Sequence, residues 1–244
     1  MSFLLIPAID VRDSRVVRLA QGDYARETVY DDLPLDAACR FSETGAQWLH
    51  LVDLDAARVG GYSLQALVRQ IVDGTALQVQ TGGGIRNEQH IEQLLESGVA
   101  RVVVGTLAVR EPERIARWLL QYGAERITVA LDARQDAAGE WRLPVSGWTE
   151  DSPHTLAQLV QRYVDAGLCH LLCTDIARDG MLGGFNVSLY AMLAQRWPQL
   201  QVQASGGVRG VADIVAVRGA GASAAILGRG LLERRFTLAE ALSC

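Results

Sequence analysis

Two aspartates occupy matching places in the chain, each at the end of an apolar run that predicts a β-strand. Asp10 ends the run "IPAID", and Asp132 ends the run "VALD" 122 positions later. A single Asp after a strand usually caps a loop. Two at repeated positions favour chemistry instead, because one carboxylate can take a proton from a substrate while the other gives one. We therefore predict that Asp10 and Asp132 form a catalytic base and acid.

A second pair of aspartates repeats at the same spacing. Asp53 ends "LHLVD", and Asp175 ends "LLCTD". Asp175 is the stronger candidate for catalysis, because "CTDIARDGMLGG" continues into a glycine-rich loop, including Gly180, that is suited to covering a ligand. Asp53 has the better claim to a structural role.

Glycines also repeat, in two similar segments 123 positions apart. A Gly-Gly pair follows the third and the seventh predicted strand, and one further glycine follows the fourth and the eighth. Glycine lets backbone N–H groups approach a phosphate, and a helix start behind it adds a favourable dipole. We therefore predict two phosphate cradles and a substrate with a phosphate at each end; the alternative is that these glycines only form tight turns. The cradle residues are Gly83, Gly84, Gly105 and Thr106 in the first segment, and Gly206, Gly207, Gly228 and Arg229 in the second.

Three larger side chains are weaker candidates for substrate binding. Arg18 in "VVRLAQGDY" is placed to hold a phosphate or a carboxamide, although an exposed arginine on a β-turn explains it equally well. Arg86 is placed to bridge from the first cradle to the substrate. Trp148 in "VSGWTED" is suited to stacking on a flat heterocycle, and packing on the rim of the fold is the alternative.

The elements that position these residues alternate regularly. Short Val-, Ile- and Leu-rich runs predict strands covered on both faces, as in a parallel sheet. Amphipathic stretches predict helices between them, including 87–98 with Asn87 as N-cap and 152–167 starting at Ser152 and Pro153. The predicted strands are 4–9, 48–52, 77–80, 101–105, 127–131, 170–174, 201–205 and 224–228.

Eight strands alternating with helices in 244 residues predict an α/β fold, a (β/α)8 TIM barrel, with an open doubly wound sheet as the rival. The repeat favours the barrel, since a duplicated half closes on its copy. We expect one domain over 1–244, built from two duplicated (β/α)4 halves, approximately 1–123 and 124–244.

Composition excludes several classes of protein. The net charge is −5 and there is no basic run, so we expect no nucleic-acid partner. No apolar run reaches the length of a membrane span, and the N-terminus lacks the features of a signal peptide. The four cysteines form no Cys-x-x-Cys pair and the four histidines show no metal-ligand spacing. We therefore expect a cytoplasmic protein with reduced thiols and no metal.

Several motifs together resemble one family over nearly the whole chain. "PAIDVRDSRVVRLAQGDY", "LHLVDLDAA", "GGGIR", "VVVGT", "ALDAR", "VSGW", "CTDIARDG", "SGGV" and "LGRGLLE" are similar to the phosphoribosylformimino-5-aminoimidazole carboxamide ribotide isomerases of histidine biosynthesis. The resemblance implies a cytoplasmic (β/α)8 barrel that needs no cofactor and no metal. It also implies a bisphosphate substrate, in agreement with two cradles.

The resemblance implies an Amadori rearrangement of an aminoaldose, ProFAR, to an aminoketose, PRFAR. Asp132 matches the general acid that opens the furanose ring to a Schiff base, and Asp10 matches the base that removes the C2 proton. Thr174 and Asp175 match positions linked to catalysis, and the choice between Asp132 and Asp175 as principal acid stays open. The chain departs from the family at Ser14, where glycine is usual, and at Met181, where threonine is common.

Other functions remain as alternatives. The cyclase subunit of imidazole glycerol phosphate synthase shares the halves and both aspartates, but "AID" and Arg18 favour the isomerase. A second activity on phosphoribosyl anthranilate and a non-catalytic phosphate-binding barrel are further possibilities. We expect a monomer in which the loops over 21–28 and 145–153 are mobile lids.

Overall fold

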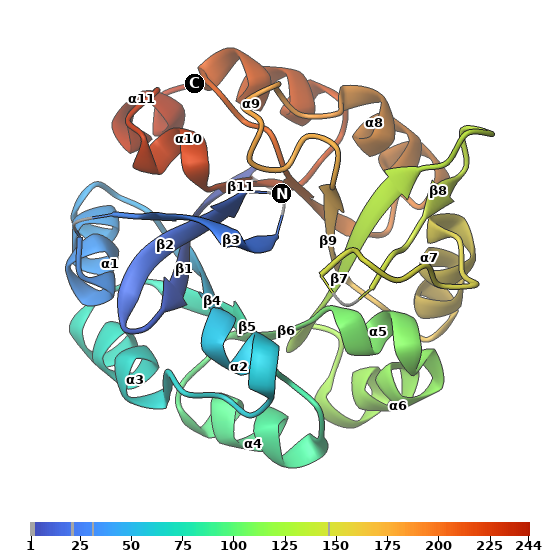
Figure 1. Cartoon of the computed structure of the whole chain (residues 1–244), viewed down its shortest axis with the longest axis horizontal. Helices are drawn as coiled ribbons and strands as arrows, with labels where there is room; N and C mark the ends of the chain where they lie inside the picture. The colour runs from blue at the N-terminus through green and yellow to red at the C-terminus, as the bar shows by residue number, and fades with distance from the viewer. Residues whose placement is uncertain (1–2, 21, 31, 146) are drawn as a thin grey trace.

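Eight parallel strands close into a barrel in the computed structural model, which describes residues 3–20, 22–30, 32–145 and 147–244 (Figure 1). The barrel closes where Ile6 on the first strand pairs with Ile226 on the last. The prediction of a (β/α)8 barrel is confirmed, all eight predicted strands are present, and the open sheet was wrong. In order around the barrel the strands are β1 (Leu4–Arg12), β4 (Trp48–Asp53), β5 (Gln78–Gly82), β6 (Arg101–Val104), β7 (Ile127–Gln135), β9 (His170–Asp175), β10 (Gln201–Ser205) and β11 (Ala224–Leu227).

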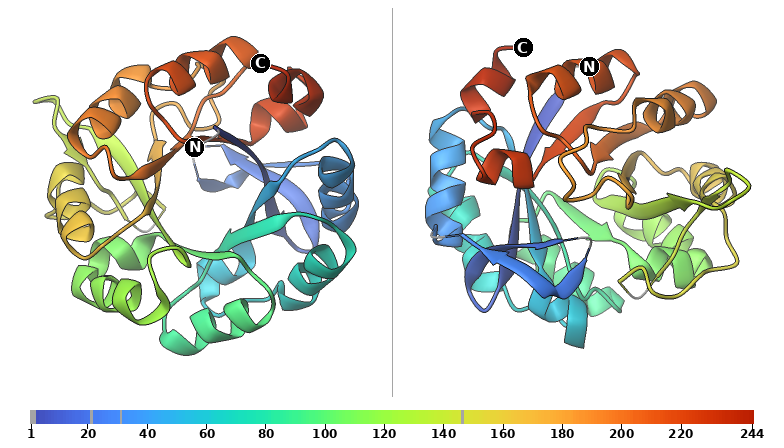
Figure 2. Two further views of the ribbon diagram at one scale, coloured as in Figure 1. Left: turned by 180° about the vertical axis from the view of Figure 1, so that it is seen from behind. Right: turned by 45° about the horizontal axis from the view of Figure 1, so that its top comes forward.

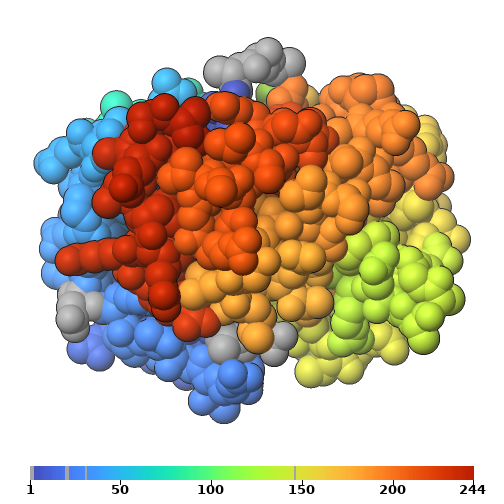
Figure 3. All heavy atoms as spheres, turned by 90° about the horizontal axis from the view of Figure 1, so that it is seen from above, coloured from blue at the N-terminus to red at the C-terminus, as the bar shows by residue number. Residues whose placement is uncertain are grey.

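Helices surround the barrel as an outer layer. Seen from behind in Figure 2, they form a nearly complete ring, and Figure 3 shows the side covered by the C-terminal helices. No helix in the described ranges is long and apolar enough to cross a membrane. The helices are α1 (Pro34–Glu43), α2 (Leu54–Val59), α3 (Gln65–Gly74), α4 (Glu88–Glu96), α5 (Thr106–Arg110), α6 (Pro112–Tyr122), α7 (Leu156–Asp165), α8 (Val187–Arg196), α9 (Val211–Gly219), α10 (Arg229–Leu232) and α11 (Leu238–Leu242).

Side-chain caps mark the starts of α4 and α7, and the sequence predicted the first of these and not the second. The Asn87 side chain accepts a hydrogen bond from the His90 N–H, so the predicted N-cap of α4 is confirmed. The predicted start of α7 at Ser152 and Pro153 was wrong. The helix is capped instead by Thr155, in a reciprocal capping box with Gln158. The side chain of each residue accepts a hydrogen bond from the backbone N–H of the other, so two otherwise unpaired N–H groups are satisfied.

A hairpin after β1 was not predicted. Strands β2 (Arg15–Ala20) and β3 (Asp23–Val29) pair antiparallel and reach over the middle of the barrel end that faces the viewer in Figure 1. The turn into β2 uses Asp13 and Ser14 at φ 49° and 61°, so Ser14 adopts the left-handed conformation that glycine would favour. A further strand, β8 (Trp141–Arg142), pairs antiparallel with the C-terminal end of β7. Gln21 and Ser146, in the two predicted lids, lie outside the described residues, and the mobility of both loops stays a prediction.

The barrel interior shows how the two predicted halves meet. Gln80 on β5 and Gln203 on β10 are both buried and come from opposite halves of the chain. Gln80 Nε2 donates to Gln203 Oε1 at 2.7 Å, and Gln203 Nε2 donates to Gln80 Oε1 at 3.1 Å. The glutamines are 123 positions apart, so repeat-related residues bond reciprocally across the axis, as a two-fold relation requires. The boundary between the halves stays a prediction.

Candidate active site

Arg18 lies between two carboxylates at the mouth of the barrel, which is the end formed by the C-terminal ends of the strands. Its Nη1 donates to Asp10 Oδ2 at 2.8 Å, and its Nη2 forms an ion pair with Asp179. Burial opposes the charge of Arg18, but Asp179 and Asp10 outweigh it and raise the pKa of the guanidinium above its usual value. The alternative of an exposed arginine on a turn is therefore wrong, because Arg18 lies on β2 and its two Nη atoms are paired with carboxylates.

Asp132 lies on β7, opposite β1 in the barrel, in a different environment. Burial raises the pKa of its carboxyl above the usual range, although hydrogen bonds from Trp148 and Thr174 act in the other direction. The indole Nε1 of Trp148 donates to Asp132 Oδ2 at 2.9 Å. Thr174 is the register partner of Asp132 on β9 and is buried. A carboxyl with a raised pKa is better suited to giving a proton than one with the usual pKa.

Trp148 also connects the two predicted lids. It takes the left-handed conformation at φ 69° in the loop after β7, and its six-membered ring lies 3.4 Å from where a Cβ on Gly22 would stand. Gly22 belongs to the β2–β3 turn. The loops after the first and fifth barrel strands therefore meet beside Asp132.

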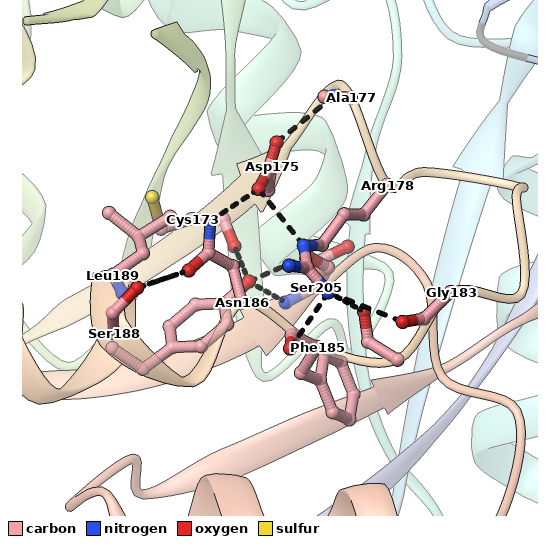
Figure 4. Close-up of polar contacts among 12 residues, drawn as sticks. Cys173, Asp175, Ala177, Arg178, Gly183, Phe185, Asn186, Ser188, Leu189 and Ser205 are labelled. Atoms are coloured by element: carbon pink, nitrogen blue, oxygen red, sulfur yellow. Dashed lines mark hydrogen bonds and ion pairs between the residues drawn. The ribbon is translucent and has the colours of Figure 1, made fainter. Parts of the chain in front are cut away.

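Asp53 and Asp175 both hold loops together rather than facing the barrel mouth. Asp175 Oδ1 accepts from the Ala177 N–H at 3.0 Å and Oδ2 accepts from Asn186 Nδ2 at 2.7 Å (Figure 4). Asp53 accepts from the backbone of Ala56 at 2.8 Å and from the Ser63 hydroxyl at 2.8 Å. These contacts agree with the structural role predicted for Asp53 and give Asp175 the same kind of role.

The two Gly-Gly pairs satisfy a packing requirement. Gly83 and Gly84 have φ values of 112° and 69°, and a Cβ on Gly83 would stand 2.2 Å from the Asp53 carbonyl oxygen. Gly206 and Gly207 have φ values of 94° and 95°, and a Cβ on Gly207 would stand 2.6 Å from the Gly184 oxygen. The tight-turn alternative therefore explains why these positions are glycine, whether or not they also bind phosphate.

Gly105 and Gly228 have no such packing requirement. Each precedes a short helix, α5 or α10, at φ −102° and −99°, and the nearest atoms to an added Cβ are 4.0 and 3.9 Å away. Thr106 and Arg229 are the first residues of these helices, whose N–H groups have no partner within the helix itself. N–H groups at a helix start that have no partner within the helix are suited to binding an anion.

The remaining arginine candidates contact the protein. Arg229 donates to the Gly180 carbonyl and pairs with Glu233, which ties the loop after β9 to α10. Arg86 is exposed, and its guanidinium lies over Gly60, where a Cβ would stand 2.6 Å from its Cζ. The structure thus places Arg229 beside the second predicted cradle, and Arg86 in the loop after β5 with its guanidinium against the loop after β4.

One group of metal-ligand type exists among the described residues, far from this mouth. Glu125, Cys169 and His170 lie at the N-terminal ends of β7 and β9, with their ligand atoms within 4.8 Å of one another. Sequence spacing missed this group because Glu125 comes from another strand. Arg101 lies 4.0 Å from Glu125, so a bound cation would meet a like charge.

Asp179 is the residue of the mouth that sequence reasoning missed. It is 6 % exposed, and burial raises the pKa of its carboxyl, while Arg18 acts in the other direction. The search for repeats did not find it, because the equivalent position in the first half is Ala57. Its only signal was its place in the motif "CTDIARDG", directly before Gly180.

Comparisons with known proteins agree with this architecture. The model of the family described as "Histidine biosynthesis protein" matches residues 4–237. A Stenotrophomonas maltophilia (strain R551-3) protein is 59% identical over 244 residues, covering all of both chains. A Xanthomonas campestris pv. campestris (strain B100) protein is 58% identical over the same length. Both are named 1-(5-phosphoribosyl)-5-((5-phosphoribosylamino)methylideneamino) imidazole-4-carboxamide isomerase. The chain therefore belongs to the histidine biosynthesis protein family.

Proposed function

We propose that the chain is an aldose–ketose isomerase that converts ProFAR to PRFAR by an Amadori rearrangement in L-histidine biosynthesis. The observation that carries this proposal is the pair Asp10 and Asp132, which face each other across the mouth with different partners. Membership of the family and relatives named as this isomerase over their full length support it.

The two aspartates divide the proton transfers. Asp132, whose carboxyl pKa burial raises, protonates the furanose ring oxygen, so that the ring opens to a Schiff base. Asp10, paired with Arg18, then removes the proton from C2. The electrons of that C–H bond move to the Schiff base and give an enolamine, which becomes the ketose when C1 is protonated. Thr174 positions Asp132 through its hydrogen bond.

Asp179 and Asp175 have different roles in this proposal. Asp179 shares the counter-ion of Asp10 and has a raised carboxyl pKa, so it is a second candidate proton donor. Asp175 holds the loop that carries Asp179, because its carboxylate is bonded to Ala177 and Asn186. Asp175 therefore positions Asp179 and is not itself the acid, the role for which it was a candidate on sequence grounds.

The substrate extends between two phosphate sites. One phosphate binds at Gly105 and Thr106, beside Gly83 and Gly84, and the other at Gly228 and Arg229, beside Gly206 and Gly207. In both sites the short helix start supplies N–H groups and the Gly-Gly pair shapes the loop. Trp148 stands next to Asp132, where an indole can stack on the imidazole of the substrate.

The test is turnover of the aminoaldose bisphosphate by the purified protein. Asp10→Asn and Asp132→Asn should each lower kcat by at least about 10²-fold, the usual contribution of a general acid or base. Asp73→Asn, an exposed aspartate on α3, is the matched control and should keep wild-type activity. A wild-type protein that binds the substrate and does not convert it would refute the proposal.

Two further properties belong to the same proposal. We infer a monomer, because the acid–base pair and both phosphate sites come from one barrel. We also infer that the protein is cytoplasmic. The bisphosphate is its small-molecule partner, and neither a nucleic acid nor a cofactor takes part. Sedimentation at assay concentration tests the monomer.

A further inference from the structure

A group of three polar side chains lies inside the barrel, nearer the N-terminal ends of the strands than the proposed base. His50 on β4 points into the barrel beside the bonded glutamines Gln80 and Gln203. All three side chains are at least nine-tenths buried. Burying three polar side chains in an otherwise apolar interior is costly unless their hydrogen bonds are satisfied. Their bonding pattern is therefore informative.

The pattern fixes the position of the His50 proton. Gln80 Nε2 carries two hydrogens; one goes to Gln203 Oε1 at 2.7 Å, and the other points to His50 Nδ1 at 3.1 Å. Nδ1 is therefore an acceptor without a proton. Burial, helped by the charge of Arg18, lowers the pKa of His50 to about 4, so the ring is neutral at pH 7. A neutral ring with a bare Nδ1 carries its proton on Nε2.

The Nε2–H group is left without a hydrogen-bond partner by this pattern. In the described part of the chain it has no hydrogen-bond partner, yet it is not among the fully buried atoms that lack one. It therefore belongs to the small part of the ring that remains exposed. The charge of Arg18 acts on this ring, and Arg18 is bonded to Asp10. Val52, two residues after His50 on the same strand, pairs in register with Asp10.

We propose that Gln80 is a positioning residue for the isomerisation: it keeps the His50 proton on Nε2, from where the neutral ring donates a hydrogen bond to the oxygen on C2 of the substrate. This inference rests on the proposed function. Asp10 takes the proton from C2, and the C2 oxygen gains electron density as the enolamine becomes a ketose. A neutral imidazole N–H can stabilise such an oxygen without transferring its own proton.

The repeat supplies a matched control. Gln80→Met and Gln203→Met remove the same amide from the same layer, but only the Gln80 variant removes the donor to His50. Both should lose similar thermal stability. Gln80→Met should lower kcat by about 10-fold or more with little change in KM, as loss of an orienting partner commonly does. Gln203→Met should keep kcat near the wild-type value, and equal losses in the two variants would refute the positioning role.

Histidine variants test the donor itself. His50→Leu should lower kcat by about 10²-fold, the usual effect of losing one such donor. His50→Gln should restore much of the rate, because its amide N–H can occupy the place of Nε2–H. In the His50→Leu background, Gln80→Met should have no further effect on kcat. An additive effect would show that Gln80 acts by another route.

A spectroscopic measurement decides the proton position independently of activity. Nitrogen-15 NMR of the histidine rings, with His50 assigned by its loss in His50→Gln, should show a bare Nδ1 and a protonated Nε2. If both glutamine amides were turned by 180°, their mutual hydrogen bonds would remain, but Gln80 Oε1 would face His50 Nδ1 and would require a proton there. A protonated Nδ1 in the spectrum would therefore overturn the inference. Wild-type protein that binds but does not convert ProFAR would refute the proposed function, while this spectrum would still decide whether Gln80 fixes the tautomer.

Discussion

Removing Arg18 should leave two carboxylates in a buried site without their counter-ion. The Arg18 side chain is 21% exposed, and those of Asp10 and Asp179 are 10% and 9% exposed. Breaking a buried ion pair costs about 3–5 kcal/mol. Because the guanidinium keeps some contact with water, we expect Arg18→Met to lower the free energy of unfolding by about 3 kcal/mol. For a chain of this size that corresponds to a fall in Tm of about 9 °C.

The stability loss of Arg18→Met should depend on pH, and the structure indicates the direction. Without Arg18 the pKa of Asp179, which burial already raises, rises further in the native state. Between the usual and the raised pKa of this carboxyl, the native variant therefore binds more protons than the unfolded chain does. Its deficit is therefore largest at neutral pH and becomes smaller as the pH falls through the raised pKa.

Urea unfolding at pH 7.5 and pH 5 measures both effects. The control is Arg15→Met, the same substitution at an exposed position on the same strand, which should change stability by less than about 0.5 kcal/mol. Adding Asp179→Asn to Arg18→Met should recover part of the loss. The reasoning is refuted if Arg18→Met costs no more than Arg15→Met, or if its deficit grows as the pH falls.

Three further predictions concern other parts of the structure. Ser14→Gly should stabilise the protein by about 1 kcal/mol in urea unfolding, because Ser14 has φ 61°, and Ser14→Ala should not. Gly83→Ala should cost at least about 3 kcal/mol, since its Cβ would stand 2.2 Å from a carbonyl oxygen, whereas Gly105→Ala should keep stability and weaken substrate binding; similar stability losses in both would contradict this contrast. Between pH 6.5 and 4 the unfolded chain protonates His50 and the native state does not, so stability should fall by about 3 kcal/mol as pH is lowered, and His50→Gln should flatten that slope.

Sequence patterns predicted the strands because each buries both faces and therefore reads as a continuous apolar run. They predicted the start of α4 because Asn87 caps it alone. The patterns gave the wrong start for α7. Ser152 and Pro153 are typical of a helix start, but the helix begins after Thr155, which forms a capping box. The β2–β3 hairpin was missed because it is held by tertiary contacts: Arg18 looks like a surface residue until Asp10 and Asp179 are placed beside it.

The repeat was a good guide to architecture and a partial guide to the site. Asp53 and Asp175 match in sequence and match again in their use as loop anchors, so the preference for Asp175 in catalysis came from its glycine-rich neighbours and not from its own contacts. Asp179 has no repeat partner. A search for matched residues finds what the two halves share, and a group present in one half only is invisible to it.

That difference between the halves gives two identical side chains different surroundings. Asp10 and Asp132 stand at equivalent strand ends, and a symmetric mouth would give them the same hydrogen-bond partners. Beside Asp10 the second half contributes Asp179 and the hairpin contributes Arg18, so that carboxylate has a cation as its partner. Beside Asp132 the partner is the neutral indole of Trp148, and burial raises the carboxyl pKa. In the proposed function the duplicated frame supplies the two aspartates and the two predicted phosphate sites, and the single-copy residues Arg18 and Trp148 give the aspartates the different partners that a base and an acid need.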